Sequence, residues 1–163
     1  MAPNVEVPRH LLSQLGRQAA DIERLVADLD EQSLARRIDP GKWSLKELVC
    51  HLWRVQQIFA GRIEAVLSED YPAILPYEPD GDAEFERMAA RPLAESLRGL
   101  AAERQRLLAR LESLDPAGWR RAGNHPEFPD YDVRFQVEYM AYHEAHHIYQ
   151  MLQRRAALAR PGD

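Results

Sequence analysis

Histidine and glutamate side chains recur in one short stretch near the end of the sequence. His143, Glu144 and His147 match the HExxH string of zinc peptidases, in which two histidines one helical turn apart bind zinc and the glutamate acts as a base. Those peptidases also need a third zinc ligand, and no His, Glu or Cys follows His147. They also contain a β-sheet, for which this sequence gives no pattern. We therefore do not favour a zinc peptidase.

Helical geometry separates the histidines of this stretch. At about 100° per residue, His143 and His147 fall next to each other on one flank of an apolar stripe, and His146 falls on the opposite, outer face. Glu144 falls near the centre of the stripe, which comprises Val133, Met140, Ile148 and Met151. We expect His143 and His147 to reach one metal ion and His146 to point away from it.

A third ligand is expected from another helix. His51 flanks the apolar stripe of an earlier segment, beside Leu48 and Val55. Three neutral imidazoles plus water form a common open zinc-type site, and helical bundles build such sites from facing helices. The alternative is that each histidine is a hydrogen-bonded core residue. His10 and His125 have no such supporting pattern, and we expect them on the surface.

Four segments with helical spacing of apolar residues must position these side chains. They cover about residues 8–30, 44–69, 92–114 and 132–158. Ser44 and Glu47 form a capping box at the start of the second segment. Proline and glycine mark two long connections, at 70–91, with a short helix near 82–90, and at 115–131. The pattern predicts an all-α protein, a four-helix bundle with two long connecting loops.

Composition limits the classes of protein that this sequence can belong to. The 163 residues predict a single domain, 1–163, and the formal net charge of −5 argues against a nucleic-acid partner. Cys50 is the only cysteine, so there is neither an intrachain disulfide nor a cysteine-based zinc cluster. The start of the chain does not resemble a signal peptide, and no apolar run is long enough for a membrane span. We expect a cytoplasmic protein that does not bind a membrane.

Two motifs together resemble the DinB/YfiT-like superfamily. One is the stretch Gly41–Leu52 with its Trp-Ser pair and His51, and the other is His143–Ile148. The resemblance covers nearly the whole chain and implies a four-helix bundle, often a homodimer, with a metal site of three histidines. The metal ligands of that family fall on His51, His143 and His147, the set that the helical phases also select.

The resemblance also implies a class of chemistry. Some members of the superfamily transfer a low-molecular-weight thiol such as bacillithiol or mycothiol to small molecules, and one group isomerises maleylpyruvate. The resemblance therefore implies a divalent metal, zinc or nickel, and bacillithiol or a similar thiol as co-substrate. A divalent metal favours the thiolate, which attacks an electrophilic carbon. Two alternatives stay open: a hydrolase with metal-bound water, helped by Glu144 or a loop carboxylate, and a non-enzymatic module that binds a metal or small ligand.

Two charged residues occupy inward positions. Arg104 interrupts a leucine series and is expected either to hold the carboxylate of a substrate or thiol, or to extend its charged end past the edge of the bundle. Glu144 needs a partner because a free buried carboxylate is costly. We expect it to accept a hydrogen bond from the ring of His51, or else from the indole of Trp43, and so to support the metal ligands without binding the metal. Cys50 points away from His51, which predicts a structural role.

Overall fold

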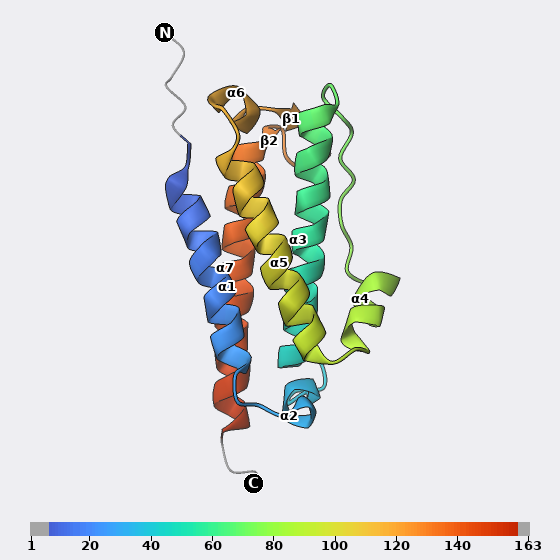
Figure 1. The fold of residues 1–163 in the computed structure, drawn as a ribbon. Helices are drawn as coiled ribbons and strands as arrows, with labels where there is room; N and C mark the ends of the chain where they lie inside the picture. The colour runs from blue at the N-terminus through green and yellow to red at the C-terminus, as the bar shows by residue number, and fades with distance from the viewer. Residues whose placement is uncertain (1–6, 160–163) are drawn as a thin grey trace.

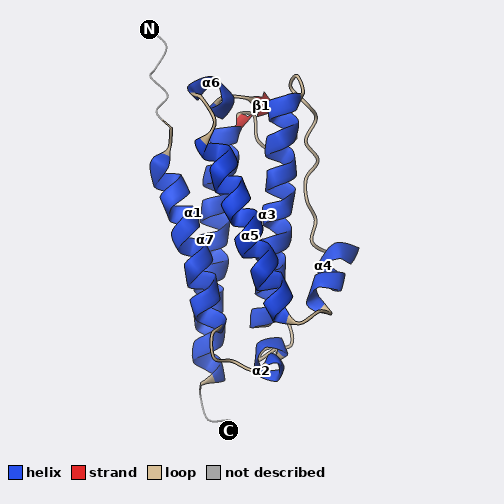
Figure 2. Cartoon of the chain, viewed as in Figure 1, coloured by secondary structure: helices blue, strands red, loops and turns tan. Residues whose placement is uncertain are grey.

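Four long helices form the body of the molecule (Figure 1; Figure 2). The computed structural model describes residues 7–159. The long helices are α1 (Arg9–Val26), α3 (Leu45–Ser68), α5 (Leu93–Glu112) and α7 (Val133–Leu158). The connections carry α2 (Glu31–Ala35), α4 (Ala83–Ala89), α6 (Pro116–Trp119) and the strands β1 (Ala122–Gly123) and β2 (Tyr131–Asp132). The predicted four-helix bundle with two long connections is confirmed.

Local side-chain chemistry sets several helix ends. The Ser44 hydroxyl accepts a hydrogen bond from the Glu47 N–H, and the Glu47 carboxylate accepts one from the Ser44 N–H, so the capping box is confirmed. Asp132 caps α7 by accepting from the Phe135 N–H. Helix α1 ends four residues before the expected residue 30, because the chain turns at Asp28, where φ is +61°.

The direction of the helices explains the first long connection. Helices α3 and α5 run in the same direction and α1 and α7 in the opposite one (Figure 1). Each of α1 and α3 packs against both α5 and α7, so α1 and α3 lie diagonally across the bundle. A chain that leaves α3 must return along its length, roughly 36 Å for 24 residues, before α5 can start parallel to it. The extended part of residues 69–92 covers that distance.

The second connection does not need to cross the bundle lengthwise. Helices α5 and α7 are antiparallel, and residues 113–132 stay at one end of the bundle (Figure 1). There they form α6 and the antiparallel pair β1–β2, with Ala122 opposite Asp132 and Gly123 opposite Tyr131. This connection therefore caps one end of the bundle (Figure 1).

Polar residues divide the core into two apolar clusters. One cluster includes Leu15, Phe59, Leu107 and Met140, and the other includes Ile22, Leu52, Leu100 and Met151. On each long helix a buried polar residue separates them: Gln18, Gln56, Arg104 and Glu144. Within residues 7–159, no helix is both long and apolar enough to cross a membrane.

Candidate metal centre

Three histidine rings converge between α3 and α7. Nε2 of His143 lies 3.3 Å from Nε2 of His51 and 3.2 Å from Nε2 of His147. One ligand atom from each residue lies within 4.8 Å of the other two. In the part of the chain that the structure describes, this is the only group of three potential ligands from His, Cys, Asp and Glu at such separations. Sequence and structure therefore select the same three histidines.

The chemistry of this donor set fits a divalent metal ion. The Nδ1–H of His147 donates to Oε1 of Gln150 at 2.8 Å, which leaves an unprotonated Nε2 facing the other rings. With His51 and His143 also protonated on Nδ1, all three Nε2 lone pairs would meet at one point, which is the arrangement that a divalent cation binds. In this structure Nδ1 of His51 and Nδ1 of His143 are buried without a hydrogen-bond partner. Metal-bound imidazoles usually donate their second N–H to an oxygen acceptor, as His147 does to Gln150.

Burial keeps the three rings neutral. Burial, followed by the neighbouring histidines, lowers the pKa of His51 to about 3 and that of His143 to about 4. Burial also lowers the pKa of His147, and the hydrogen bond to Gln150 opposes this shift. A metal ligand must be unprotonated, so the lowered pKa values of the three rings favour binding, and His51 and His143 stay neutral well below pH 7.

A cavity of about 350 Å³ opens beside the three rings. One wall follows a single face of α3, from His51 through Val55 and Phe59 to Arg62. The opposite wall is α7, and residues 76–79 and 125–128 cover the space. The indole of Trp43, the second of the two expected partners of Glu144, also lines the cavity, with its ring centroid 4.6 Å from that of His51. A small organic molecule can therefore contact the metal centre.

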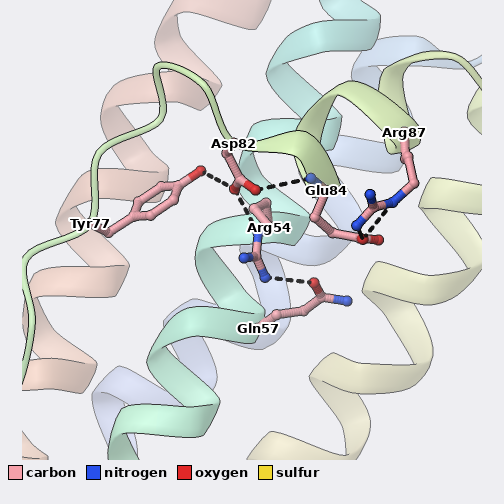
Figure 3. A network of polar contacts seen from close by, with 6 residues as sticks. All are labelled: Arg54, Gln57, Tyr77, Asp82, Glu84 and Arg87. Carbon is pink, nitrogen blue, oxygen red and sulfur yellow. Dashed lines mark hydrogen bonds and ion pairs between the residues drawn. The ribbon is translucent and has the colours of Figure 1, made fainter.

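A carboxylate fixes the first cover segment, the extended chain of residues 72–82, to α3. Tyr77 donates its hydroxyl hydrogen to Oδ2 of Asp82 at 2.9 Å, and Nε of Arg54 donates to the same oxygen at 2.7 Å (Figure 3). The other oxygen of Asp82 accepts from the Glu84 N–H at 3.0 Å, at the start of α4. The extended segment, α4 and α3 thus meet at one side chain.

Backbone contacts join the two cover segments. The Asn124 N–H donates to the Pro72 carbonyl at 2.8 Å, and the Ile74 N–H donates to the Asn124 carbonyl at 2.8 Å. Gly123 makes this approach possible, because a Cβ atom there would lie 2.9 Å from the Pro72 oxygen. The cavity is therefore closed by two segments that are distant in sequence but joined to each other.

His125 lies in the cavity wall, so the expectation of a surface position was wrong. Its side chain is 7% exposed, and its ring stacks on Tyr131 with centroids 4.6 Å apart. Nδ1 accepts a hydrogen bond from the Glu127 N–H at 3.2 Å. The residue sits in an irregular loop, where no periodicity indicates which side chains face inward. His10 is exposed, as expected.

Glu144 pairs with Arg104, so the expectation that His51 or Trp43 would be its partner was wrong. Nη1 of Arg104 donates to Oε1 at 3.0 Å and Nη2 donates to Oε2 at 2.5 Å, and both residues are 2% exposed. His51 and Trp43 make no hydrogen bond to this carboxylate. Arg104 lies in the core and not at the bundle edge, and it does not line the cavity. We therefore do not retain a role for Arg104 in holding a substrate or thiol.

The remaining expectations concern residues near the centre. His146 is exposed on the outer face of α7, as predicted, and contacts Gln150. Cys50 is fully buried, and its Sγ lies 3.6 Å from the Ser96 hydroxyl, away from the cavity. The sequence reasoning missed Gln150 and Arg62. Arg62 carried a detectable signal, because it lies eleven positions after His51 and therefore on the same face of α3.

Comparison with known proteins assigns the chain to a family and agrees with the fold. The model of the DinB superfamily matches residues 14–151, and the chain belongs to this superfamily. A Bacillus mycoides protein named "Putative metal-dependent hydrolase" is 28% identical over 127 residues, covering 78% of this chain and 73% of that protein. An Oceanobacillus iheyensis protein with the same description is 24% identical over 147 residues, covering 88% and 85% of the two chains.

A solved structure shares the architecture. It is described as "YfiT from Bacillus subtilis is a probable metal-dependent hydrolase with an unusual four-helix bundle topology". The TM-score is 0.82 at 21% identity, over 94% of this chain and 88% of that one. The likeness therefore concerns the fold of nearly the whole chain.

Proposed function

We propose that this protein is a metal-dependent enzyme that joins a low-molecular-weight thiol to a small electrophilic molecule. The observation that carries the proposal is the convergence of the Nε2 atoms of His51, His143 and His147 at the wall of a cavity sized for a small molecule. A divalent metal held there, zinc or nickel, would acidify a thiol that enters the open position.

The chain's own residues favour an external nucleophile. Among the described residues, the cavity wall contains no Cys, Ser, Thr or Lys that could attack a substrate. Glu144 is bonded to Arg104 in the core and does not line the cavity, so it cannot accept a proton from a bound nucleophile. In the proposed transfer the thiol sulfur bonds to carbon, the leaving group departs with the bond electrons, and the thiol proton passes to solvent.

Hydrolysis is the second candidate. The relatives from Bacillus mycoides and Oceanobacillus iheyensis carry the name "Putative metal-dependent hydrolase", which supports water as the nucleophile. A hydrolase must also protonate its leaving group. The carboxylates of the cavity wall are Glu78 and Glu127, and both are exposed to solvent. Transfer of a thiol with loss of a halide needs no such acid, which is why we place it first.

One assay separates the two reactions. The metal-loaded protein is incubated with monochlorobimane and each of a panel of thiols, including bacillithiol and mycothiol, and the fluorescent conjugate is measured. Thiol transfer predicts conjugation with one thiol and little with the others. Turnover of esters or amides without thiol would instead assign hydrolysis, and no turnover of either kind would contradict the enzymatic proposal.

Two variants control this assay. His51→Ala removes one proposed ligand and should abolish conjugation. His146→Ala removes an exposed histidine of the same stretch and should leave conjugation unchanged. Equal activity of the two variants would show that the conjugation is not metal-dependent at this centre.

A further inference from the structure

The end of the cavity formed by Arg62, His125 and Tyr131 has no part in holding a metal. We propose that these three residues form an anion subsite that binds a carboxylate of the small-molecule substrate. The inference deepens the proposed function, on which it rests for the reactive part of that substrate. The binding itself requires neither the metal nor the thiol.

Arg62 presents a positive charge to the cavity. Its Nη1 donates to the Tyr131 hydroxyl at 2.9 Å, and its Nη2 donates to the Leu75 carbonyl at 2.5 Å. The guanidinium carbon lies 5.5 Å from the ring centroid of Phe59 and 5.9 Å from that of Tyr131. Among residues 7–159, no carboxylate forms an ion pair with it. A guanidinium has five N–H donors, so three remain for a ligand.

His125 and Tyr131 add neutral donors beside this charge. Nδ1 of His125 accepts from the Glu127 N–H, so the ring proton of the neutral imidazole is on Nε2, which can donate to a ligand. Burial and then the charge of Arg62 lower the pKa of His125, against a smaller opposite effect of Glu127, which favours the neutral ring near pH 7. The Tyr131 oxygen accepts from Arg62, which leaves its hydroxyl hydrogen free to donate.

The charge of the site selects a carboxylate over a phosphate. Arg62 supplies one positive charge, while Glu78 and Glu127 place two negative charges along the same cavity wall. A carboxylate carries one negative charge and matches the planar guanidinium at two points. A phosphate monoester carries close to two charges near pH 7 and would be repelled more strongly by the two glutamates.

The spacing along α3 defines the shape of the ligand. His51 and Arg62 are eleven positions apart, which places their Cα atoms about 16 Å apart along the helix axis. Val55, Phe59 and Tyr139 line the wall between them. The substrate class is therefore an elongated molecule with a carboxylate at one end, an apolar or aromatic middle and its electrophilic carbon at the other end.

A matched pair of unreactive probes tests the subsite. Binding of 4-phenylbutyrate and of its neutral amide, 4-phenylbutyramide, is measured by calorimetry, without thiol, on the metal-loaded protein. The acid should bind about 10- to 100-fold more tightly than the amide. Arg62→Met should remove this preference while the amide binds as before. Arg62→Lys should keep part of it, and Arg106→Met, which changes an exposed arginine on α5, should keep all of it.

Several results would overturn the subsite. The first is equal binding of the acid and the amide. The second is an equal loss of affinity for both probes in Arg62→Met, which would indicate a structural role of Arg62 through Leu75. The third is tighter binding of phenyl phosphate than of the acid. A preference for the acid that disappears when a chelator removes the metal would place the carboxylate on the metal. Because no turnover is measured, the subsite can be confirmed even if the thiol assay fails.

Discussion

Arg104 and Glu144 form an ion pair with two hydrogen bonds in the middle of the bundle. Glu144 directly follows the proposed ligand His143 in the sequence. Arg104 also donates to the Leu15 carbonyl at 2.6 Å and to Oε1 of Gln56 at 2.5 Å. These contacts join α1, α3, α5 and α7 in one polar layer. The glutamate of the HExxH-like string is therefore part of the core and not of the reacting centre.

Loss of one partner of this pair should destabilise the fold strongly. Glu144→Ala leaves the Arg104 charge buried without its carboxylate, and we expect the free energy of unfolding to fall by about 3–5 kcal/mol. Urea unfolding of the metal-free protein measures this change. Glu138→Ala, on the same helix and partly exposed, should change stability by no more than about 0.5 kcal/mol.

Replacing both partners tests what the pair contributes to the metal centre. A buried ion pair can often be exchanged for apolar residues of similar volume without loss of stability. We expect the double variant Arg104→Met, Glu144→Leu to be more stable than Glu144→Ala and to bind metal as the unmodified protein does. A stable double variant that no longer binds metal would restore to Glu144 a role in supporting the ligands.

Each of the three converging histidines should be necessary for metal binding. His51→Ala, His143→Ala and His147→Ala should each reduce the metal content of the purified protein from about one ion per chain to near zero, measured by elemental analysis. His146→Ala should retain the ion because its ring faces outward. Undiminished metal in the first three variants would disprove the assignment.

Gln150 should tune metal affinity through His147. Its Oε1 accepts the Nδ1–H of His147, so Gln150→Ala frees the ring and should weaken metal binding about 10- to 100-fold in a competition titration with a chelator. Gln153→Ala, an exposed glutamine one turn further along α7, is the control and should have no effect. Equal affinities for the two variants would show that Gln150 does not orient the ligand.

Asp82 should hold the first cover segment in place. Asp82→Asn weakens the contacts to Arg54 and Tyr77, and we expect faster amide hydrogen exchange in residues 72–82 at neutral pH. Asp80→Asn, in the same segment but exposed, should leave the exchange rates unchanged. Faster exchange in both variants would point to a general loosening and not to this carboxylate.

The same carboxylate predicts a pH dependence. Burial alone would raise the pKa of Asp82, but hydrogen bonds from Arg54, Tyr77 and the Glu84 N–H lower it overall from its ordinary value of 3.8. A lowered folded-state pKa means that the stabilisation is complete above the ordinary pKa and is lost as pH falls through the folded-state value. The stability difference between the unmodified protein and Asp82→Asn should be constant from pH 7 to about 5 and shrink below pH 3.8. A stability difference that stays constant down to pH 2 would contradict a stabilising role of the ionised Asp82 carboxylate.

The homodimer expected from the resemblance stays a prediction. Light scattering of the purified protein should give twice the chain mass of 18.7 kDa at micromolar concentration. A single chain mass at high micromolar concentration would contradict it. The cytoplasmic location also stays a prediction.

The sequence by itself determined the helices and the three converging histidines. Both depend on the 3.6-residue period, which is a local property of the chain and fixes which side chains share one face of a helix. His51, His143 and His147 each flank an apolar stripe, so their inward direction followed from neighbours in the same helix. The capping box at Ser44 was predictable for the same reason, because its partner Glu47 is three residues away.

Tertiary structure alone decided how these elements meet. The pairing of Arg104 with Glu144 depends on α5 and α7 lying diagonally across the bundle. Periodicity predicts that each charged side chain points inward, but it does not predict which residue it will pair with. His125 lies in a loop without a period, so only the contacts with Tyr131 and the joined cover segments place it in the cavity. The proposed anion subsite likewise combines α3 with a connection more than 60 residues later in the chain. Such long-range contacts arise when the four helices pack, and local sequence patterns do not encode them.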